Sequence, residues 1–192
     1  MSVDLAHLLE ESGAILRGHF IFTSGRHSDT YFEKFRVLER PDVLSALAKE
    51  VAEHYANQEI SYVAGPTTGG IIIAFEVGRQ MNKPTIYVET EDGKKALRRG
   101  RTIPAGAKVL VVDDVLTTGT SLLETRQAIE EAGGEVVAFA VLIDRSPKSI
   151  DLGLPTFASF IADAEKYPSY APDEIPDWLA AIPAVKPGTR KS

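Results

Sequence analysis

The chain has 192 residues, of which 44% are hydrophobic and 25% charged, a balance typical of one globular domain with a single buried core. Its net charge of −6 argues against a general nucleic-acid binder, and it contains no cysteine, which excludes disulfides, thiolate chemistry and cysteine-based zinc sites. The longest clear apolar run, residues 136–143, is too short to span a membrane, and acidic residues at the amino end do not resemble a signal peptide. We therefore expect a cytoplasmic protein that binds neither membrane nor nucleic acid.

The first part of the chain predicts a helix, two strands and a second helix. The leucine spacing over residues 4–17, with Leu16 at its end, indicates an amphipathic helix. Residues 18–35 alternate apolar and polar side chains around a Thr-Ser-Gly turn, which indicates strands around a tight loop. Pro41 suits the first turn of a helix that continues to about Asn57.

The centre of the chain alternates strands and helices. Strands are predicted over residues 60–64, 85–88, 109–112 and 136–143, and helices over residues 71–81 and 121–132. This alternation predicts a parallel sheet with right-handed crossovers, in which ligands bind at the carboxyl ends of the strands. We therefore expect the loops over residues 65–70, 113–121 and 144–145 to meet at one edge, and the strand over 136–143 to be the last central strand.

The most informative stretch is VLVVDDVLTTGTS, residues 109–121. An apolar run ends in Asp113 and Asp114 and passes through a loop rich in hydroxyls and glycine into a helix. Backbone N–H groups around Thr118 to Ser121 can hold a phosphate, while the two carboxylates face sugar hydroxyls or a metal ion. Either half alone is more often a structural turn. Together they favour a ligand with both a phosphate and a diol, of which ribose 5-phosphate is the simplest.

A basic cluster precedes this stretch and reverses the sign of the local charge. It consists of Lys94, Lys95, Arg98, Arg99 and Arg101, with glycines at 93 and 100. Such a cluster is either a solvated face or, between glycines, a mobile loop that closes over a polyphosphate ligand.

Four segments in chain order resemble the orotate phosphoribosyltransferases, which are type I phosphoribosyltransferases. GHFIFTSGRHSDTY (18–31) is similar to their amino-terminal motif, and AGPTTGG (64–70) to their pyrophosphate loop. Residues 112–121 resemble the loop that binds 5-phosphoribosyl 1-pyrophosphate (PRPP), and Ile143-Asp144-Arg145 the end of their following strand. The KPG of residues 186–188 resembles one bacterial branch.

This resemblance implies the type I phosphoribosyltransferase fold, an α/β domain whose mostly parallel central sheet is flanked by helices. The single domain, 1–192, would comprise an N-terminal hood segment (1–40), an α/β core (41–150) and a C-terminal extension (151–192). The implied reaction joins orotate and PRPP to give orotidine 5′-monophosphate and pyrophosphate in pyrimidine synthesis. It implies Mg²⁺ held mainly by PRPP, and a homodimer whose subunits share their active sites.

The resemblance also assigns residues to roles. The PRPP site would comprise Thr67, Thr68, Gly69, Gly70, Asp113, Asp114, Val115, Leu116, Thr117, Thr118, Gly119, Thr120 and Ser121. Orotate would contact Thr117 and Arg145, since a guanidinium pairs with a carboxylate through two parallel hydrogen bonds. The catalytic set would be Asp113 and Asp114, which position the ribose hydroxyls, with Lys94 or Lys95, which reaches the pyrophosphate of the neighbouring subunit.

Three positions depart from the family pattern: Thr23, Gly69 and Thr90 stand where cationic residues are common. We expect the basic cluster to compensate. Lys34 either reaches the site or lies on the surface, and His27 either contacts ligand or caps its turn.

The tail lacks the cysteine pair that the related branch often carries, and apolar packing by Ile175 and Trp178 is the expected replacement. Two other functions stay open. One is a phosphoribosyltransferase for a purine or uracil, and the other is a non-catalytic PRPP-sensing regulator.

Overall fold

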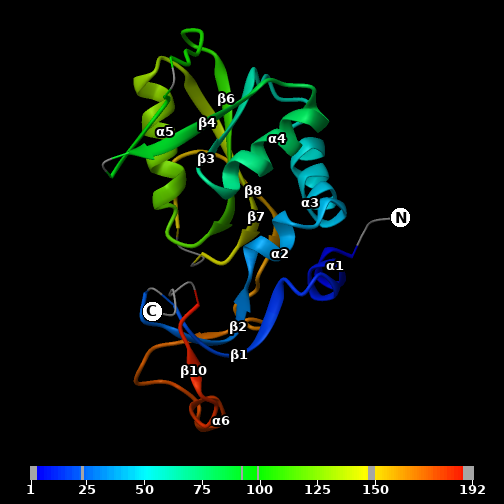
Figure 1. The fold of residues 1–192 in the computed structure, drawn as a ribbon, viewed down its shortest axis with the longest axis vertical. Helices are drawn as coiled ribbons and strands as arrows, with labels where there is room; N and C mark the ends of the chain where they lie inside the picture. Colours follow the sequence, from blue (N-terminus) through cyan, green and yellow to red (C-terminus); the bar gives the residue numbers. More distant parts are fainter. Residues whose placement is uncertain (1–3, 23, 92, 99, 147–149, 188–192) are drawn as a thin grey trace.

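The computed structural model describes residues 4–22, 24–91, 93–98, 100–146 and 150–187, which form two sheets (Figure 1). A six-stranded core sheet lies in the upper part of the figure, and a four-stranded hood sheet lies below it. Thr23 and Arg99 lie outside the described residues. None of the described helices is both long and apolar enough to cross a membrane.

The core sheet has the strand order β5-β4-β3-β6-β7-β8. Its strands are β3 (Tyr62–Pro66), β4 (Thr85–Glu91), β5 (Lys94–Ala96), β6 (Lys108–Leu116), β7 (Glu135–Asp144) and β8 (Thr156–Ile161). Neighbouring strands run parallel except β4 and β5, which form an antiparallel hairpin. The predicted mostly parallel sheet is confirmed.

Helices cover both faces of the core sheet (Figure 1): α3 (Pro41–His54) and α4 (Gly69–Met81) on one, α5 (Thr120–Glu131) on the other. Alternate residues of β6 enter different cores. Leu110 and Val112 join the core under α3 and α4, whereas Val109 and Val111 join the core under α5. Burial on both faces explains why this strand is a continuous apolar run.

The hood sheet combines the two ends of the chain, in the order β10-β1-β2-β9. Its strands are β1 (Ile15–Ile21), β2 (His27–Phe32), β9 (Ser169–Tyr170) and β10 (Ala184–Val185), with the short helices α1 (Leu5–Glu11), α2 (Lys34–Leu38) and α6 (Asp177–Ala180) nearby. The β1–β2 hairpin confirms the predicted strands around residues 23–25. The division of the domain at residues 40 and 150 stays a prediction.

The helix predicted over residues 4–17 is too long. It ends at Glu11, and Gly13 follows with a φ of +71°, a left-handed conformation that terminates a helix. Leu16 therefore lies in β1, where it is 37% exposed, and not on a helical apolar face.

One strand of the tail was not predicted, and one expectation about the tail is wrong. The strand over 136–143 is the last central strand, as predicted, but β8 pairs with it in parallel at the edge of the sheet. β8 is an edge strand of half-buried residues, so it lacks the apolar run that marks a central strand. Trp178 does not pack inside. It is 53% exposed, and Leu179 is the buried residue of α6.

Candidate functional site

The carboxyl ends of β3, β6 and β7 bring the three predicted loops together, as expected. The backbone N–H of Arg145, just after β7, donates to the carbonyl of Leu116 at the end of β6 (2.9 Å). Gly69, just after β3, lies so close to β6 that a Cβ on it would stand 2.9 Å from Oδ2 of Asp114. The edge thus combines acids, amides and a guanidinium from distant parts of the sequence.

The phosphate-type loop leads directly into α5. Thr117 and Thr118 are exposed, and the hydroxyls of Thr118 and Thr120 lie 3.1 Å apart. Gly119 is the N-cap residue of α5 and has a φ of +76°. A Cβ added at this position would collide with the side chain of Leu152. Since glycine has no side chain with which to cap the helix, the first N–H groups of α5 are available to an anion.

The acidic pair lies within β6, near its carboxyl end. The strand extends to Leu116, whereas the prediction ended it at Val112. Asp113 is 8% exposed, and its Oδ1 accepts from the backbone N–H of Asp114 (2.9 Å). Burial raises the pKa of the Asp113 carboxyl, and the charge of Asp114 raises it further. Val115, next to this pair, is half-buried and Leu116 is buried, so these two side chains pack towards the protein interior and stabilise the loop.

Asp114 is the more accessible acid and has two partners. Its Oδ1 accepts from the N–H of Val115 (2.7 Å), and its Oδ2 forms an ion pair with Nζ of Lys34 (2.8 Å). Lys34 begins α2, which follows the hood strand β2. The alternative in which Lys34 reaches the site is therefore the one observed.

The loop after β3 forms a second site that can bind an anion. Thr67 and Thr68 are exposed, while Gly69 and Gly70 are buried and begin α4. Thr68 makes no side-chain hydrogen bond to cap this helix, so the first amides of α4 are also available to an anion.

Arg145 lies between the core sheet and the hood. Its guanidinium carbon is 4.4 Å from the ring centre of Phe22 and 5.1 Å from that of Phe32. Burial lowers the pKa of Arg145 to about 10, which still leaves it cationic at neutral pH. No carboxylate within the described part of the chain forms an ion pair with it. A charged guanidinium between aromatic walls suits a flat, anionic ring such as a pyrimidine carboxylate.

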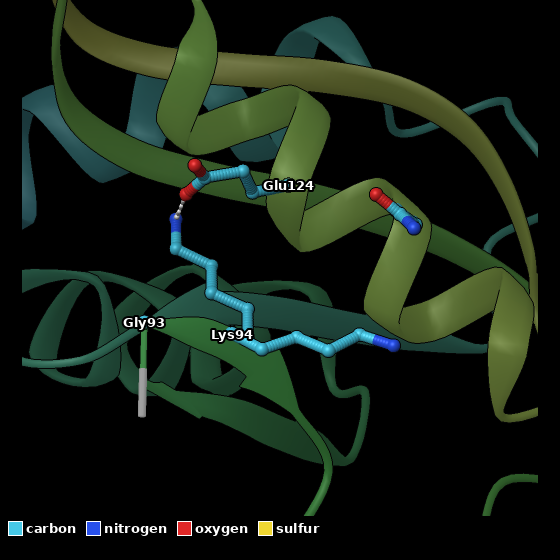
Figure 2. Close-up of a pocket in the computed structure, with 5 residues that line it drawn as sticks. Gly93, Lys94 and Glu124 are labelled. Carbon is cyan, nitrogen blue, oxygen red and sulfur yellow. Dashed lines mark ion pairs between the residues drawn. The ribbon is translucent and has the colours of Figure 1, made fainter. Parts of the chain in front are cut away.

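The two lysines predicted to be catalytic lie against α5 of their own chain. Lys95 has a side chain only 9% exposed, and its Nζ donates to the carbonyl and the hydroxyl of Ser121 (both 2.8 Å). Lys94 is 66% exposed and pairs with Glu131 at 3.1 Å. Figure 2 shows the pocket between the β4–β5 hairpin and α5, with Lys94 on the hairpin and Glu124 above it on the helix. The open loop expected between the glycines is thus partly the strand β5.

Sequence reasoning missed the aromatic walls of Arg145, because Phe22 and Phe32 carry no signal beyond their place in a hairpin. His27 binds the neighbouring hood strand instead of capping its turn. Its Nδ1 is hydrogen-bonded to Nε2 of His19 (2.7 Å), whose Nδ1 donates to the carbonyl of Ile182 (2.9 Å). This histidine pair ties β1 and β2 to the tail.

Amide cups, paired acids and a guanidinium at the edge of a parallel sheet define a phosphoribosyltransferase, and comparison with known proteins agrees. The family described as phosphoribosyl transferase domain matches residues 37–151. A curated relative named orotate phosphoribosyltransferase, from Pelotomaculum thermopropionicum, is 44% identical over 98% of this chain and 97% of its own length.

Two solved structures have the same fold. The orotate phosphoribosyltransferase of Aeropyrum pernix aligns with a TM-score of 0.71 and 31% identity over 82% of this chain and 93% of its own. That of Mycobacterium tuberculosis in complex with PRPP aligns with a TM-score of 0.64 and 25% identity over 82% and 94%. The chain belongs to the phosphoribosyltransferase family and, within it, to the orotate phosphoribosyltransferases.

Proposed function

We propose that this protein transfers the ribose 5-phosphate of PRPP to orotate, giving orotidine 5′-monophosphate and pyrophosphate in pyrimidine synthesis. One observation carries the proposal beyond family membership. The amide cup of α5, the acids of β6 and the aromatic-walled Arg145 occur together at one edge, where a single molecule can contact all three.

The chemistry requires little from side chains as nucleophiles. The bond from the anomeric carbon to the pyrophosphate oxygen breaks, its electron pair leaves with pyrophosphate, and positive charge develops on the ribose ring. N1 of orotate loses its proton and forms the new bond to that carbon. The protein has to align the two reactants, exclude water and hold both phosphates. Nothing in this sequence of events needs a thiol, so the lack of cysteine is compatible with it.

Roles follow from the placement of the residues. The 5′-phosphate would occupy the cup formed by Thr118, Gly119, Thr120 and Ser121, and the pyrophosphate the cup formed by Thr67, Thr68, Gly69 and Gly70. Asp113 and Asp114 would accept hydrogen bonds from the ribose hydroxyls. Arg145 would pair with the carboxylate of orotate, with Thr117 beside it. The cation of the β4–β5 hairpin best placed to move is Lys94, since its side chain is exposed whereas that of Lys95 is not.

We propose that Mg²⁺ arrives bound to PRPP. The described residues include no group of three or more potential metal ligands, so they do not form a cage for the ion. They do fit an ion held mainly by substrate phosphates and water with one or two carboxylates, which is how Mg²⁺ usually binds. When bound, Mg²⁺ neutralises charge on the departing pyrophosphate. Asp114 and Asp113 are the carboxylates that would contact it.

We also propose a homodimer that works in the cytoplasm. Phe35 of α2 and Ile72 and Phe75 of α4 are 57%, 44% and 62% exposed, which is unusual for large apolar side chains on neighbouring helices. A second copy of the chain would cover them and bring Lys94 towards the other active site. Light scattering of the purified protein should give twice the monomer mass of 20.8 kDa, and a strictly monomeric active enzyme would exclude this part of the proposal.

The function is tested by incubating the protein with PRPP, Mg²⁺ and one base at a time, and following nucleotide formation by chromatography. Orotate should be converted, while adenine, guanine, hypoxanthine and uracil should not. Turnover of another base in place of orotate would assign a different phosphoribosyltransferase. PRPP binding without turnover of any base would favour a PRPP-sensing regulator.

A further inference from the structure

Lys34 connects the hood to the acidic pair, and no motif assigns it a role. Its Nζ lies 2.8 Å from Oδ2 of Asp114, with the side chains 41% and 13% exposed. The ammonium group also lies 5.7 Å from the ring centre of Phe35. Because a lysine side chain is cationic at neutral pH, this contact is an ion pair.

Gly69 makes this ion pair possible. A Cβ at position 69 would lie 2.9 Å from Oδ2 of Asp114 and 3.1 Å from Cδ1 of Leu38 in α2. Any larger residue would push either the carboxylate or α2 away. Three elements thus meet at one point beside the cup proposed for pyrophosphate. They are α2, which carries Lys34, β6, which carries Asp114, and α4, which begins at Gly69.

The electrostatics of this point require a cation. PRPP carries several negative charges, and it has to bind beside two adjacent carboxylates, whose repulsion of a phosphate a few ångströms away costs kilocalories in a partly buried site. The other cations nearby are engaged elsewhere. Nζ of Lys95 is bonded to α5, Lys94 is paired with Glu131, and Arg145 lies between aromatic rings.

We propose that Lys34 is a positioning residue for PRPP: it neutralises Asp114 and so allows the pyrophosphate to bind against the first turn of α4. The inference rests on the proposed function, since it presumes that PRPP is the ligand of this edge. The sequence predicts that the basic cluster compensates for the cation that is missing at position 69. The inference assigns this role to Lys34 instead.

The test compares three variants of the full chain: Lys34→Gln, Lys34→Arg and, as a matched control, Lys108→Gln. Lys108 forms a similar pair with Glu59 (2.7 Å, 37% exposed) at the amino end of β6, away from the site. Calorimetry should show about tenfold weaker PRPP binding for Lys34→Gln, as expected for one lost charge-assisted interaction. The KM for PRPP should rise and more Mg²⁺ should be needed for half-maximal activity, while kcat changes little. Lys34→Arg should recover most of the affinity, and Lys108→Gln should match the wild type.

A second variant, Gly69→Ala, disturbs the same ion pair through Asp114, because its added Cβ would lie 2.9 Å from Oδ2 of that residue. It should weaken PRPP binding although Lys34 is still present. Unchanged PRPP affinity and Mg²⁺ dependence in an active Lys34→Gln enzyme would overturn the inference and leave the proposed function intact. Equal losses for ribose 5-phosphate and for PRPP, with no recovery in Lys34→Arg, would also overturn it, because the lysine would then only hold the fold. Failure of the wild-type protein to bind PRPP would instead overturn the proposed function.

Discussion

The core sheet and the hood sheet contribute different kinds of contact to the same site. The core edge offers backbone amides at the starts of α4 and α5 and the acids of β6, groups that suit any phosphorylated ribose. The hood offers Phe22, Phe32 and Lys34, which face the partners at that edge, Arg145 and Asp114. The comparison indicates that the core edge, neutralised by Lys34, holds the sugar donor, and that Phe22 and Phe32 of the hood act with Arg145 on the base. Variants of the two sheets test whether the two contributions are separable.

The largest effect is expected at Arg145, where the two sheets meet. Arg145→Gln removes the fork that pairs with a carboxylate, so kcat/KM for orotate should fall on the order of 100-fold, as for a lost pair of charge-assisted hydrogen bonds. The affinity for PRPP, measured by calorimetry without orotate, should stay within about twofold because the amide cups are untouched. An equal loss for both ligands would show that the two contributions cannot be separated.

A variant at the edge of the core sheet should weaken the use of PRPP and not the binding of orotate. In Gly119→Ala the new Cβ meets Leu152 and forces a φ of +76° on a residue that disfavours it, which distorts the start of α5. The KM for PRPP should rise by about tenfold, a loss of roughly 1.4 kcal/mol.

The control for that variant is Gly106→Ala. Gly106 has a φ of +72°, but its added Cβ would have no neighbour within 4 Å. Both variants therefore share the backbone strain, and only Gly119→Ala changes the cup. If the control raises the KM for PRPP as much, strain alone explains the effect.

A milder change is expected in the hood. Phe22→Leu removes one aromatic wall but keeps an apolar side chain, so Arg145 loses a cation–π contact at 4.4 Å. The KM for orotate should rise by about fivefold, in line with roughly 1 kcal/mol for such a contact. Steady-state kinetics with PRPP saturating would measure it, and a rise confined to the KM for PRPP would assign Phe22 to the wrong ligand.

The smallest effect concerns stability and its dependence on pH. The pKa of Asp113 is raised in the folded protein, first by burial and then by Asp114, so folding is destabilised as the pH rises above the ordinary carboxyl pKa of about 4, and fully so above the raised pKa. Asp113→Asn should therefore melt a few degrees higher than the wild type at pH 8, although it loses activity. The difference should shrink as the pH falls towards about 4 and vanish below it, where the carboxyl is neutral in both states. A lower melting temperature at pH 8 would contradict this reading of the buried acid.

Local patterns made much of this predictable. Residues 109–121 contain strand, acids, loop and helix start in one run, so the order of residue types alone indicated an anion site. The rule that parallel strands carry their ligands at the carboxyl edge then placed residues 65–70 and Arg145 beside it.

Contacts that depend on how distant elements pack were not predictable. Lys34 and Asp114 are eighty positions apart, and they meet only because Gly69 lets α2 approach β6. The basic cluster was read as a loop because glycines flank it, yet residues 94–96 pair with β4 and pack on α5. Hydrophobicity alone placed Trp178 inside, whereas the buried residue of that short helix is Leu179.

One measurement tests the whole account: a crystal structure with orotidine 5′-monophosphate, a molecule that combines phosphate, ribose diol and pyrimidine carboxylate. We predict its phosphate against the amides of residues 118–121, its ribose hydroxyls against Asp113 and Asp114, and its carboxylate paired with Arg145 between Phe22 and Phe32. A phosphate bound away from the start of α5, or a carboxylate that does not reach Arg145, would contradict it.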